Sequence, residues 1–315
     1  MKKIIALFAA VVLLSTVGFV NTYAKEKVTI LMNWFPQGNQ SGFWQAQLDN
    51  PEYDDLEITI KSGGPRIRVI TQVASGQVDF GFDDADDLMT ARSKGAPVVA
   101  IFVTLDHAPY TIVYHPDQPI NTIQDLNGRT GATVLGMTWW EWTKHTFGLD
   151  NVKEIPLSGD LGLFARTPEM FQTGYSIFLP MRFDAKGVTT KQFKIADYGY
   201  KPYSIVLTTE KMIRENPELV QKVVDRLRAG HIKAFANPAP TRDLILGKSK
   251  MTTPAIHNNA VRLMREDFFP KDHNKIGCQD PARWVELADQ MKTIDALPAD
   301  FDPHQSYDLS FQRGC

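Results

Sequence analysis

The sequence predicts an α/β protein of two lobes built on mostly parallel sheets. Segments with strand patterning alternate with short helical segments, the order typical of α/β folds. About 290 of the 315 residues follow the apolar N-terminal stretch, which is more than one hydrophobic core usually serves. The middle of the chain has the pattern of a second α/β unit, so we expect one lobe to be inserted in the other.

The first 24 residues have the pattern of a secretory signal peptide. Lys2 and Lys3 precede an apolar run, and Ala24 is the small residue before the polar Lys25. We expect cleavage after about Ala24 and an exported protein, which is periplasmic if the cell has two membranes. An uncleaved anchor helix is the alternative, although the run is shorter than the roughly 20 residues that span a bilayer with ease.

The composition argues against some classes of partner. Without Lys2 and Lys3, the 34 basic and 36 acidic residues leave a net charge near −4, which does not favour nucleic acid or an anionic membrane. Cys278 and Cys315 are the two cysteines, and in an oxidising compartment they can form one disulfide. Two free thiols are the alternative. Two cysteines do not make the ligand spacing of a zinc site, so we expect no metal and no cofactor.

The first third of the chain alternates strands with helices. Strands are expected from alternating or β-branched apolar residues at 28–32, 56–60, 77–82 and 97–104. Helical spacing begins at residue 42 and recurs at 69–74 and 85–94. The turn at Ser62, Gly63 and Gly64 separates the second strand from the next helix.

A second series of strands starts after residue 106. Strand patterning is found at 110–114, 130–134, 153–155, 175–179, 193–196 and 203–208. A short helix is expected at 122–128 and another from about Thr138, and amphipathic helices at 218–236 and 281–291. The expected units are the signal peptide at 1–24, lobe I at 25–105 and 208–315, and the inserted lobe II at 106–207. Two crossings between lobes favour a hinged cleft as the ligand site.

Several stretches resemble a known family. They include "TILMNWFP" at 29–36, "GFWQA" at 42–46, "VASGQVDFG" at 73–81, "ARSKGAPVVA" at 91–100 and "IQDLNG" at 123–128. In this order they resemble the periplasmic solute-binding proteins of ABC importers, in the family that includes thiamine-pyrimidine-precursor, sulfonate, taurine and nitrate binders. The resemblance implies a two-lobed periplasmic-binding-protein fold (Venus-flytrap, type II), ligand capture between the lobes and delivery to a membrane permease. It does not fix the ligand.

The chain departs from the pyrimidine-precursor branch at two places. That branch often begins Asp-Trp-x-Pro-Asn, where this chain has Asn33 and Gln37, and it tends to have Glu-Pro where this chain has Leu179-Pro180. A carboxylate contact at position 33 therefore does not carry over. The departures favour a different or more apolar ligand.

Loops that follow strands carry the candidate ligand-binding residues of the first lobe, because ligands of α/β sheets bind beyond the carboxyl ends of the strands. Trp34 can stack on a flat ligand or cap the lobe core. Free amides of the turn can hold an anion if they start a helix, or the turn is an ordinary one. The acidic run after the third strand can cap a helix, with one carboxylate left for ligand N–H donors. The candidates are Asn33, Trp34, Phe35, Gln37, Ser62, Gly63, Gly64, Asp83 and Asp84.

The second lobe contributes an unusual tryptophan-rich stretch at 136–142. Thr138 can cap a helix, with Glu141 completing a capping box. The tryptophans cannot all face one core, so we expect Trp139 or Trp140 at the mouth of the cleft, with a partner-protein contact as the alternative. Tyr175, near a lobe connection, is a further ligand-binding candidate. No catalytic motif is present.

These observations predict a binding protein and not an enzyme. We expect a monomer that captures a thiamine-pyrimidine precursor or a related aromatic N-heterocycle and presents it to an ABC permease. A sulfonate, taurine or nitrate binder is the alternative within the same transport class. An exported enzyme of the same fold is the remote one.

Overall fold

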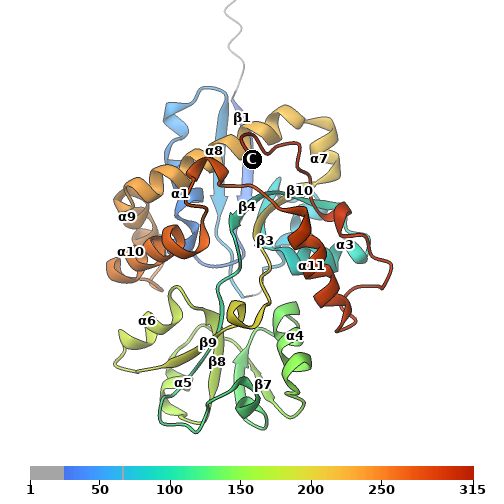
Figure 1. Ribbon diagram of the computed structural model, residues 1–315. Coiled ribbons are helices and arrows are strands. Elements are labelled where there is room, and N and C mark those ends of the chain that lie inside the picture. Colours follow the sequence, from blue (N-terminus) through green and yellow to red (C-terminus); the bar gives the residue numbers. More distant parts are fainter. Residues whose placement is uncertain (1–24, 66) are drawn as a thin grey trace, which may run out of the picture.

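The computed structural model describes residues 25–65 and 67–315, arranged as two lobes with a five-stranded sheet in each (Figure 1). The predicted signal peptide lies outside the described residues. No helix within residues 25–65 and 67–315 combines the length and apolar character needed to cross a membrane.

Lobe I is built on a sheet with the strand order β2-β1-β3-β10-β4. β1 is parallel to both β2 and β3, whereas β10 is antiparallel to its neighbours β3 and β4. Four strands therefore run in one direction and β10 alone runs in the other. The strands are β1 (Glu26–Leu31), β2 (Leu56–Lys61), β3 (Phe80–Asp84), β4 (Val98–Leu105) and β10 (Ser204–Thr209).

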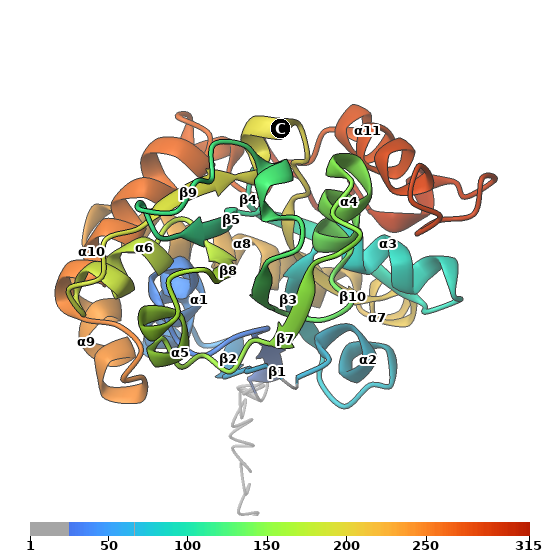
Figure 2. The same cartoon turned by 90° about the horizontal axis from the view of Figure 1, so that it is seen from below.

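Helices cover both faces of this sheet (Figures 1 and 2). They are α1 (Ser41–Leu48), α2 (Val69–Ala74), α3 (Ala85–Ser93), α7 (Glu210–Glu215), α8 (Pro217–Ala236), α9 (Ala239–Lys248), α10 (Pro254–Leu263) and α11 (Pro281–Lys292). α1 and α8 pack closely through two glycines. A Cβ atom on Gly230 would lie 2.4 Å from the carbonyl oxygen of Gly42, and one on Gly42 would lie 2.2 Å from the His231 ring. Only glycine permits this approach of the two helices.

Lobe II repeats the same topology in the order β7-β6-β8-β5-β9. β6 is parallel to β7 and β8, and β5 is antiparallel to β8 and β9. The strands are β5 (Tyr110–Tyr114), β6 (Thr130–Thr133), β7 (Lys153–Pro156), β8 (Phe171–Tyr175) and β9 (Lys191–Lys194). The helices are α4 (Thr138–Phe147), α5 (Gly162–Arg166) and α6 (Leu179–Asp184), with one-turn helices η3 (Ile123–Leu126) and η4 (Ile195–Tyr198).

In each lobe the reversed strand is the one that enters from the other lobe. β4 ends at Leu105, where the chain leaves lobe I, and β10 begins beside it, with Ser204 paired to Leu105. The chain returns through the edge by which it left, so β10 must run opposite to β4. The return therefore precedes residue 204, and the expected lobe boundary at 208 falls inside β10.

The expected strand at 175–179 is wrong. β8 ends at Tyr175, and Leu179 begins α6 with Pro180 in its first turn. Pro180 has no N–H for a strand ladder and suits the first turn of a helix. The expected capping box at Thr138 and Glu141 is also absent. Met137 is the N-cap residue, and Thr138 instead donates a hydrogen bond to Asp87 across the lobes.

A disulfide joins Cys278 to Cys315, with their Cα atoms 5.7 Å apart. It fixes the C-terminal residues to the segment that precedes α11. This is the bridge, and not the pair of free thiols, of the two alternatives that the sequence leaves open.

Candidate functional site

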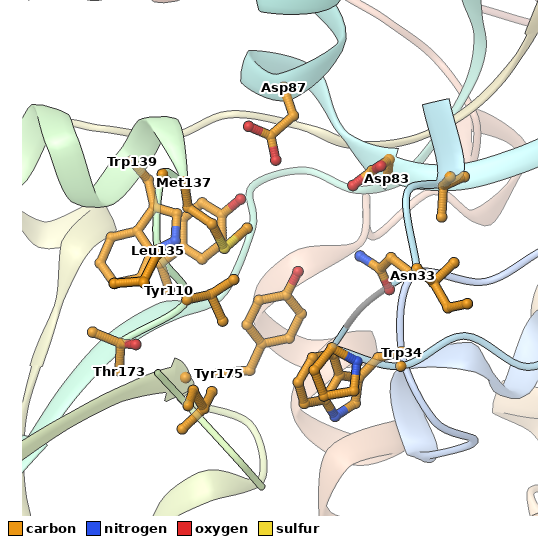
Figure 3. A pocket seen from close by; sticks show the side chains of 18 of the residues that line it. Asn33, Trp34, Asp83, Asp87, Tyr110, Leu135, Met137, Trp139, Thr173 and Tyr175 are labelled. Atoms are coloured by element: carbon orange, nitrogen blue, oxygen red, sulfur yellow. The ribbon is translucent and has the colours of Figure 1, made fainter. Parts of the chain in front are cut away.

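A cavity of about 440 Å³ lies between the two lobes, and both contribute to its walls (Figure 3). This volume is within the range that holds drug-sized ligands. The lobe I residues that line it include Asn33, Trp34, Gln37, Gly64, Arg68, Asp83, Asp87, Thr90 and Lys94. Those of lobe II include Tyr110, Leu135, Met137, Trp139, Gln172, Thr173, Tyr175, Phe178, Leu179 and Arg182.

Aromatic rings contribute to the lobe II wall beside aliphatic and polar residues. Tyr110, the first residue of β5, stacks on Trp139 of α4 with ring centroids 4.7 Å apart and 15° between the planes. Tyr175, the last residue of β8, meets the Tyr110 ring edge-on at 5.7 Å. Figure 3 shows these three side chains on the side of the cavity that faces Asn33 and Trp34. Tyr110 and Trp139 are only 2% and 3% exposed, so the less buried Tyr175 and Trp34 offer the more accessible rings of the two lobes.

The loop after β1 holds Trp34 in place through its backbone. The N–H of Gly63 donates to the Trp34 carbonyl oxygen at 3.0 Å, and the Gln40 side chain donates to the same oxygen at 3.2 Å. A Cβ atom on Gly63 would lie 2.0 Å from the Met32 carbonyl oxygen, so only glycine fits beneath this loop. The Trp34 ring is half-buried and lines the cavity.

Four aspartates at the start of α3 lie where the lobes meet. Asp84 is fully buried and accepts hydrogen bonds from the hydroxyls of Tyr110 at 2.7 Å and Tyr175 at 2.9 Å. Asp86, also buried, accepts from Tyr200 at 2.9 Å. Asp87 accepts from Thr138 at 3.0 Å and lines the cavity, as does Asp83. Asp84, Asp86 and Asp87 therefore join the lobes, and Asp83 and Asp87 line the cavity.

Burial makes these acids weaker than free aspartate. Removal from water raises the pKa of Asp83 well above its ordinary value, and the neighbouring charges of Asp87 and Asp84 add to this. Burial, reinforced by Asp84, also raises the pKa of Asp87 to about 6. For Asp84, burial outweighs the hydroxyl hydrogen bonds, so its pKa rises as well. Asp87 can therefore change charge near neutral pH.

Three basic side chains line the cavity as well. Arg68 and Lys94 are exposed, and the positive charge of Arg68 partly opposes the rise in the pKa of Asp87. Arg182 of α6 is partly buried, and burial lowers the pKa of its guanidinium. The cavity is thus mixed in charge, with acids at the end of β3 and the start of α3 and a desolvated cation on α6.

The structure brings together seven of the residues predicted from the sequence. The cavity-lining ones are Asn33, Trp34, Gln37, Gly64, Asp83, Trp139 and Tyr175. The others do not line it: Phe35, Ser62, Gly63, Asp84, Thr138 and Trp140.

Each of those six has another position with a physical reason. Phe35 is 37% exposed and packs edge-on against Trp34, outside the cavity lining. Trp140 is fully buried and donates its indole N–H to Glu154 at 2.9 Å. The polar groups of Asp84 and Thr138 form hydrogen bonds between the lobes.

The expected anion site at the Ser62 to Gly64 turn is not formed as a helix start. α2 begins only at Val69, after an irregular segment, and Ser62 is exposed. The Gly63 N–H is already bonded to Trp34. Gly63 therefore supports the loop that carries Trp34.

Sequence reasoning missed Tyr110, Gln172, Thr173 and Arg182. Tyr110 begins the first strand after a crossing, a position that faces the other lobe, and this signal was available in the sequence. Gln172 and Thr173 lie inside β8, whose register was misplaced when the strand was expected at 175–179. Arg182 was missed for the same reason, because the expected strand at 175–179 overlaps the start of α6, the helix that carries Arg182.

Comparisons with known proteins agree on the fold. The periplasmic aliphatic sulphonate-binding protein SsuA from Escherichia coli superposes with a TM-score of 0.68 over 89% of this chain and 91% of that one, at 14% identity. The chain therefore has the two-lobed periplasmic-binding-protein fold.

Two relatives are recognisable from the sequence. The riboflavin-binding protein RibY of Chloroflexus aurantiacus is 22% identical over 264 residues, which are 78% of this chain and 74% of that protein. The 4-amino-5-hydroxymethyl-2-methylpyrimidine phosphate synthase of Legionella pneumophila is 30% identical over 106 residues, and the match spans about a third of each protein, 33% of this chain and 34% of the synthase. The NMT1/THI5-like family profile matches residues 52–241. Since this match covers more than half of the chain, the protein belongs to the NMT1/THI5-like family.

Proposed function

We propose that this protein is the exported substrate-binding component of an ABC importer and that it captures an aromatic N-heterocycle between its lobes. The observation that carries the proposal is the cavity wall, with Trp34 on one lobe and, on the other, Tyr175 packed against the stacked Tyr110 and Trp139. Aromatic side chains bind flat rings through offset or edge-on packing. The lobes then release the unaltered ligand to a membrane permease.

The polar groups of the cavity suit a ring that carries N–H or amino donors. Asp83 and Asp87 offer carboxylate oxygens, and Asn33 lies on the same side of the cavity as Asp83 in Figure 3. Carboxylates that accept from N–H donors make strong, charge-assisted hydrogen bonds. A thiamine-pyrimidine precursor has such donors, and so has the lactam edge of a flavin.

The cavity volume favours a ligand larger than one pyrimidine ring. About 440 Å³ corresponds to roughly fifteen waters at about 30 Å³ each. A single small ring leaves many of these waters in place, whereas a fused ring system displaces most of them. The name of the RibY relative makes a flavin the second ligand to test.

A sulfonate, taurine or nitrate ligand is the second candidate, favoured by the basic lining residues Arg68, Lys94 and Arg182. Two observations weigh against it. Asp83 and Asp87 repel an anion from their part of the cavity, and a nitrate-sized ion fills little of the volume. An enzymatic role, as the synthase relative raises, needs a catalytic group in contact with substrate, and we assign none.

Ligand binding to the purified chain from Lys25 onward tests the proposal. The panel holds 4-amino-5-hydroxymethyl-2-methylpyrimidine, riboflavin, taurine, an alkanesulfonate and nitrate. A saturating ligand at a hundred times its Kd stabilises the fold by about 2.7 kcal/mol, which raises the melting temperature. We expect a heterocycle to do so and to quench tryptophan fluorescence.

Variants of neighbouring residues show whether the cavity is the site. Trp34→Leu is expected to weaken heterocycle binding at least tenfold, whereas Phe35→Leu, next to it but outside the lining, leaves binding nearly unchanged. A response to the small anions alone transfers the proposal to the second candidate. Turnover of the bound ligand contradicts the transport role.

A further inference from the structure

Arg182 is an unusual cation for this protein. It is partly buried, and within the described residues its guanidinium has one hydrogen-bond partner, the Gly159 carbonyl oxygen at 3.2 Å. No carboxylate of the described residues lies within ion-pair distance of it. A desolvated positive charge without a counter-charge is costly, so such groups in proteins are usually paired.

Three other arginines with buried or partly buried side chains have an ion pair or several acceptors. Arg283 pairs with Asp106 at 2.6 Å, and Arg228 with Asp225 at 3.4 Å. Arg226 has three oxygen acceptors and lies 3.6 Å from the centre of the Tyr53 ring. Arg182 alone among these four lines the cavity. Its missing partner is therefore to be sought inside the cavity.

The acids and Arg182 come from elements that lie on opposite sides of the molecule. α6, which carries Arg182, and α3, which carries Asp87, are on the left and the right of the molecule in both Figures 1 and 2. Asp87 and Arg182 come from different lobes, so a ligand that reaches both also spans the cleft. The cavity volume of about 440 Å³ leaves room for a ring with a substituent.

We propose that the physiological ligand is an amphoteric heterocycle whose ring donors face Asp83 and Asp87 and whose anionic substituent binds Arg182. This inference rests on the proposed function and narrows its ligand class. The anionic group is a carboxylate, phosphate or sulfonate, all of which match the planar fork of guanidinium donors. A ligand of this kind neutralises both sets of charges, which a neutral ring or a small anion does not.

Matched ligand pairs test the substituent. Riboflavin is compared with riboflavin 5′-phosphate, and pyridoxamine with pyridoxamine 5′-phosphate, by calorimetry and melting temperature, with inorganic phosphate alone as a further probe. We expect the phosphorylated member of at least one pair to bind about tenfold or more tightly than its parent. Inorganic phosphate at high concentration is expected to raise the melting temperature slightly.

Variants of Arg182 show whether this side chain is the cause. In Arg182→Gln the preference for the phosphorylated member is expected to disappear, and in Arg182→Lys to return in part. Arg166→Gln, an exposed arginine of the neighbouring α5 outside the cavity lining, is the control and keeps the preference. Circular dichroism establishes that each variant is folded.

The outcomes separate this inference from the proposed function. If parent rings bind as tightly as their phosphorylated forms, or if the preference survives in Arg182→Gln, the inference is wrong and the heterocycle-binding role stands. If no ring of either pair binds and phosphate has no effect, the inference is overturned, and if 4-amino-5-hydroxymethyl-2-methylpyrimidine does not bind either, so is the proposed function. If sulfonates without a ring bind through Arg182, the anionic part holds and the heterocycle part is wrong.

Discussion

Removal of the Asp84 carboxylate is expected to destabilise the protein and loosen the contact between its lobes. Asp84 is fully buried and accepts hydrogen bonds from Tyr110, Tyr175 and Ser204. Tyr110 and Ser204 are the first residues of β5 and β10, so each directly follows one of the two crossings between the lobes. One carboxylate thus fixes both crossings.

The magnitude follows from these three bonds. Asp84→Ala leaves three hydroxyls without an acceptor, and each such loss costs about 1 to 3 kcal/mol. Relief of the buried charge, which already raises the pKa of Asp84, offsets part of this. We expect a net loss of about 2 to 4 kcal/mol in the free energy of unfolding. At about 2 to 4 °C per kcal/mol for a chain of this size, the melting temperature falls by roughly 5 to 15 °C.

Chemical denaturation and calorimetry measure this, with Asp86→Ala as the matched control. Asp86, in the first turn of α3, is equally buried but accepts one tyrosine hydroxyl, from Tyr200, beside the N–H of Asp87, so its replacement is expected to cost less than that of Asp84. A double-mutant cycle of Asp84→Ala with Tyr175→Phe isolates one bond and is expected to give a coupling of about 1 kcal/mol. Equal effects of the two alanine variants, together with no coupling, would refute the reasoning.

Three further predictions concern pH, the Trp34 loop and the disulfide. Burial raises the pKa of Asp87 from 3.8 to about 6, so its protonated carboxyl stabilises the fold fully below about pH 4 and this stabilisation is lost as the pH rises through 6. Asp87→Asn should remove about 1 to 3 kcal/mol of this pH dependence of the free energy of unfolding, measured by denaturation at pH 4 to 7. The same change at exposed Asp117 should not. Gly63→Ala is expected to displace the Trp34 loop and weaken ligand binding more than tenfold, because its Cβ would lie 2.0 Å from a backbone oxygen. Gly64→Ala, whose Cβ would lie 3.3 Å from the Phe35 ring, is the milder control. Equal ligand binding by the two variants would contradict the role of Gly63 in holding this loop. Cys315→Ser opens a disulfide with a sequence separation of 37 and should cost about 2 to 4 kcal/mol in thermal unfolding without changing ligand affinity, since neither cysteine lines the cavity between the lobes.

The elements that the sequence predicted well are those whose signal is local. The alternating residues of 110–114 became β5 with the same bounds, and the helical spacing at 69–74 became α2. The strand expected at 175–179 failed because its aromatic and apolar residues have strand character, while the decision between strand and helix depended on Pro180 and on where β8 pairs with β5. A short stretch of sequence does not determine which distant strands pair with each other.

The same limit applies to the candidate site. Trp34 and Asp83 follow strands, and a rule about strand ends was enough to select them. Trp139 and Trp140 are adjacent in sequence, and no local rule could decide which of the two rings reaches the cavity. The difference depends on Glu154 of β7, which accepts a hydrogen bond from the indole N–H of Trp140 and holds that ring in the lobe II core.

The run of aspartates at 83–87 has different tasks because it spans the end of a strand and the start of a helix. Successive strand residues point to opposite sides, so Asp83 faces the cavity while Asp84 is buried beneath it. The chain then turns into α3, whose rotation of about 100° per residue separates Asp86 from Asp87. Asp86 reaches Tyr200 at the second crossing, and Asp87 reaches both Thr138 and the cavity. A ligand donor that binds Asp87 therefore acts on a carboxylate that already connects the two lobes, and this gives ligand binding a direct physical route to the arrangement of the lobes.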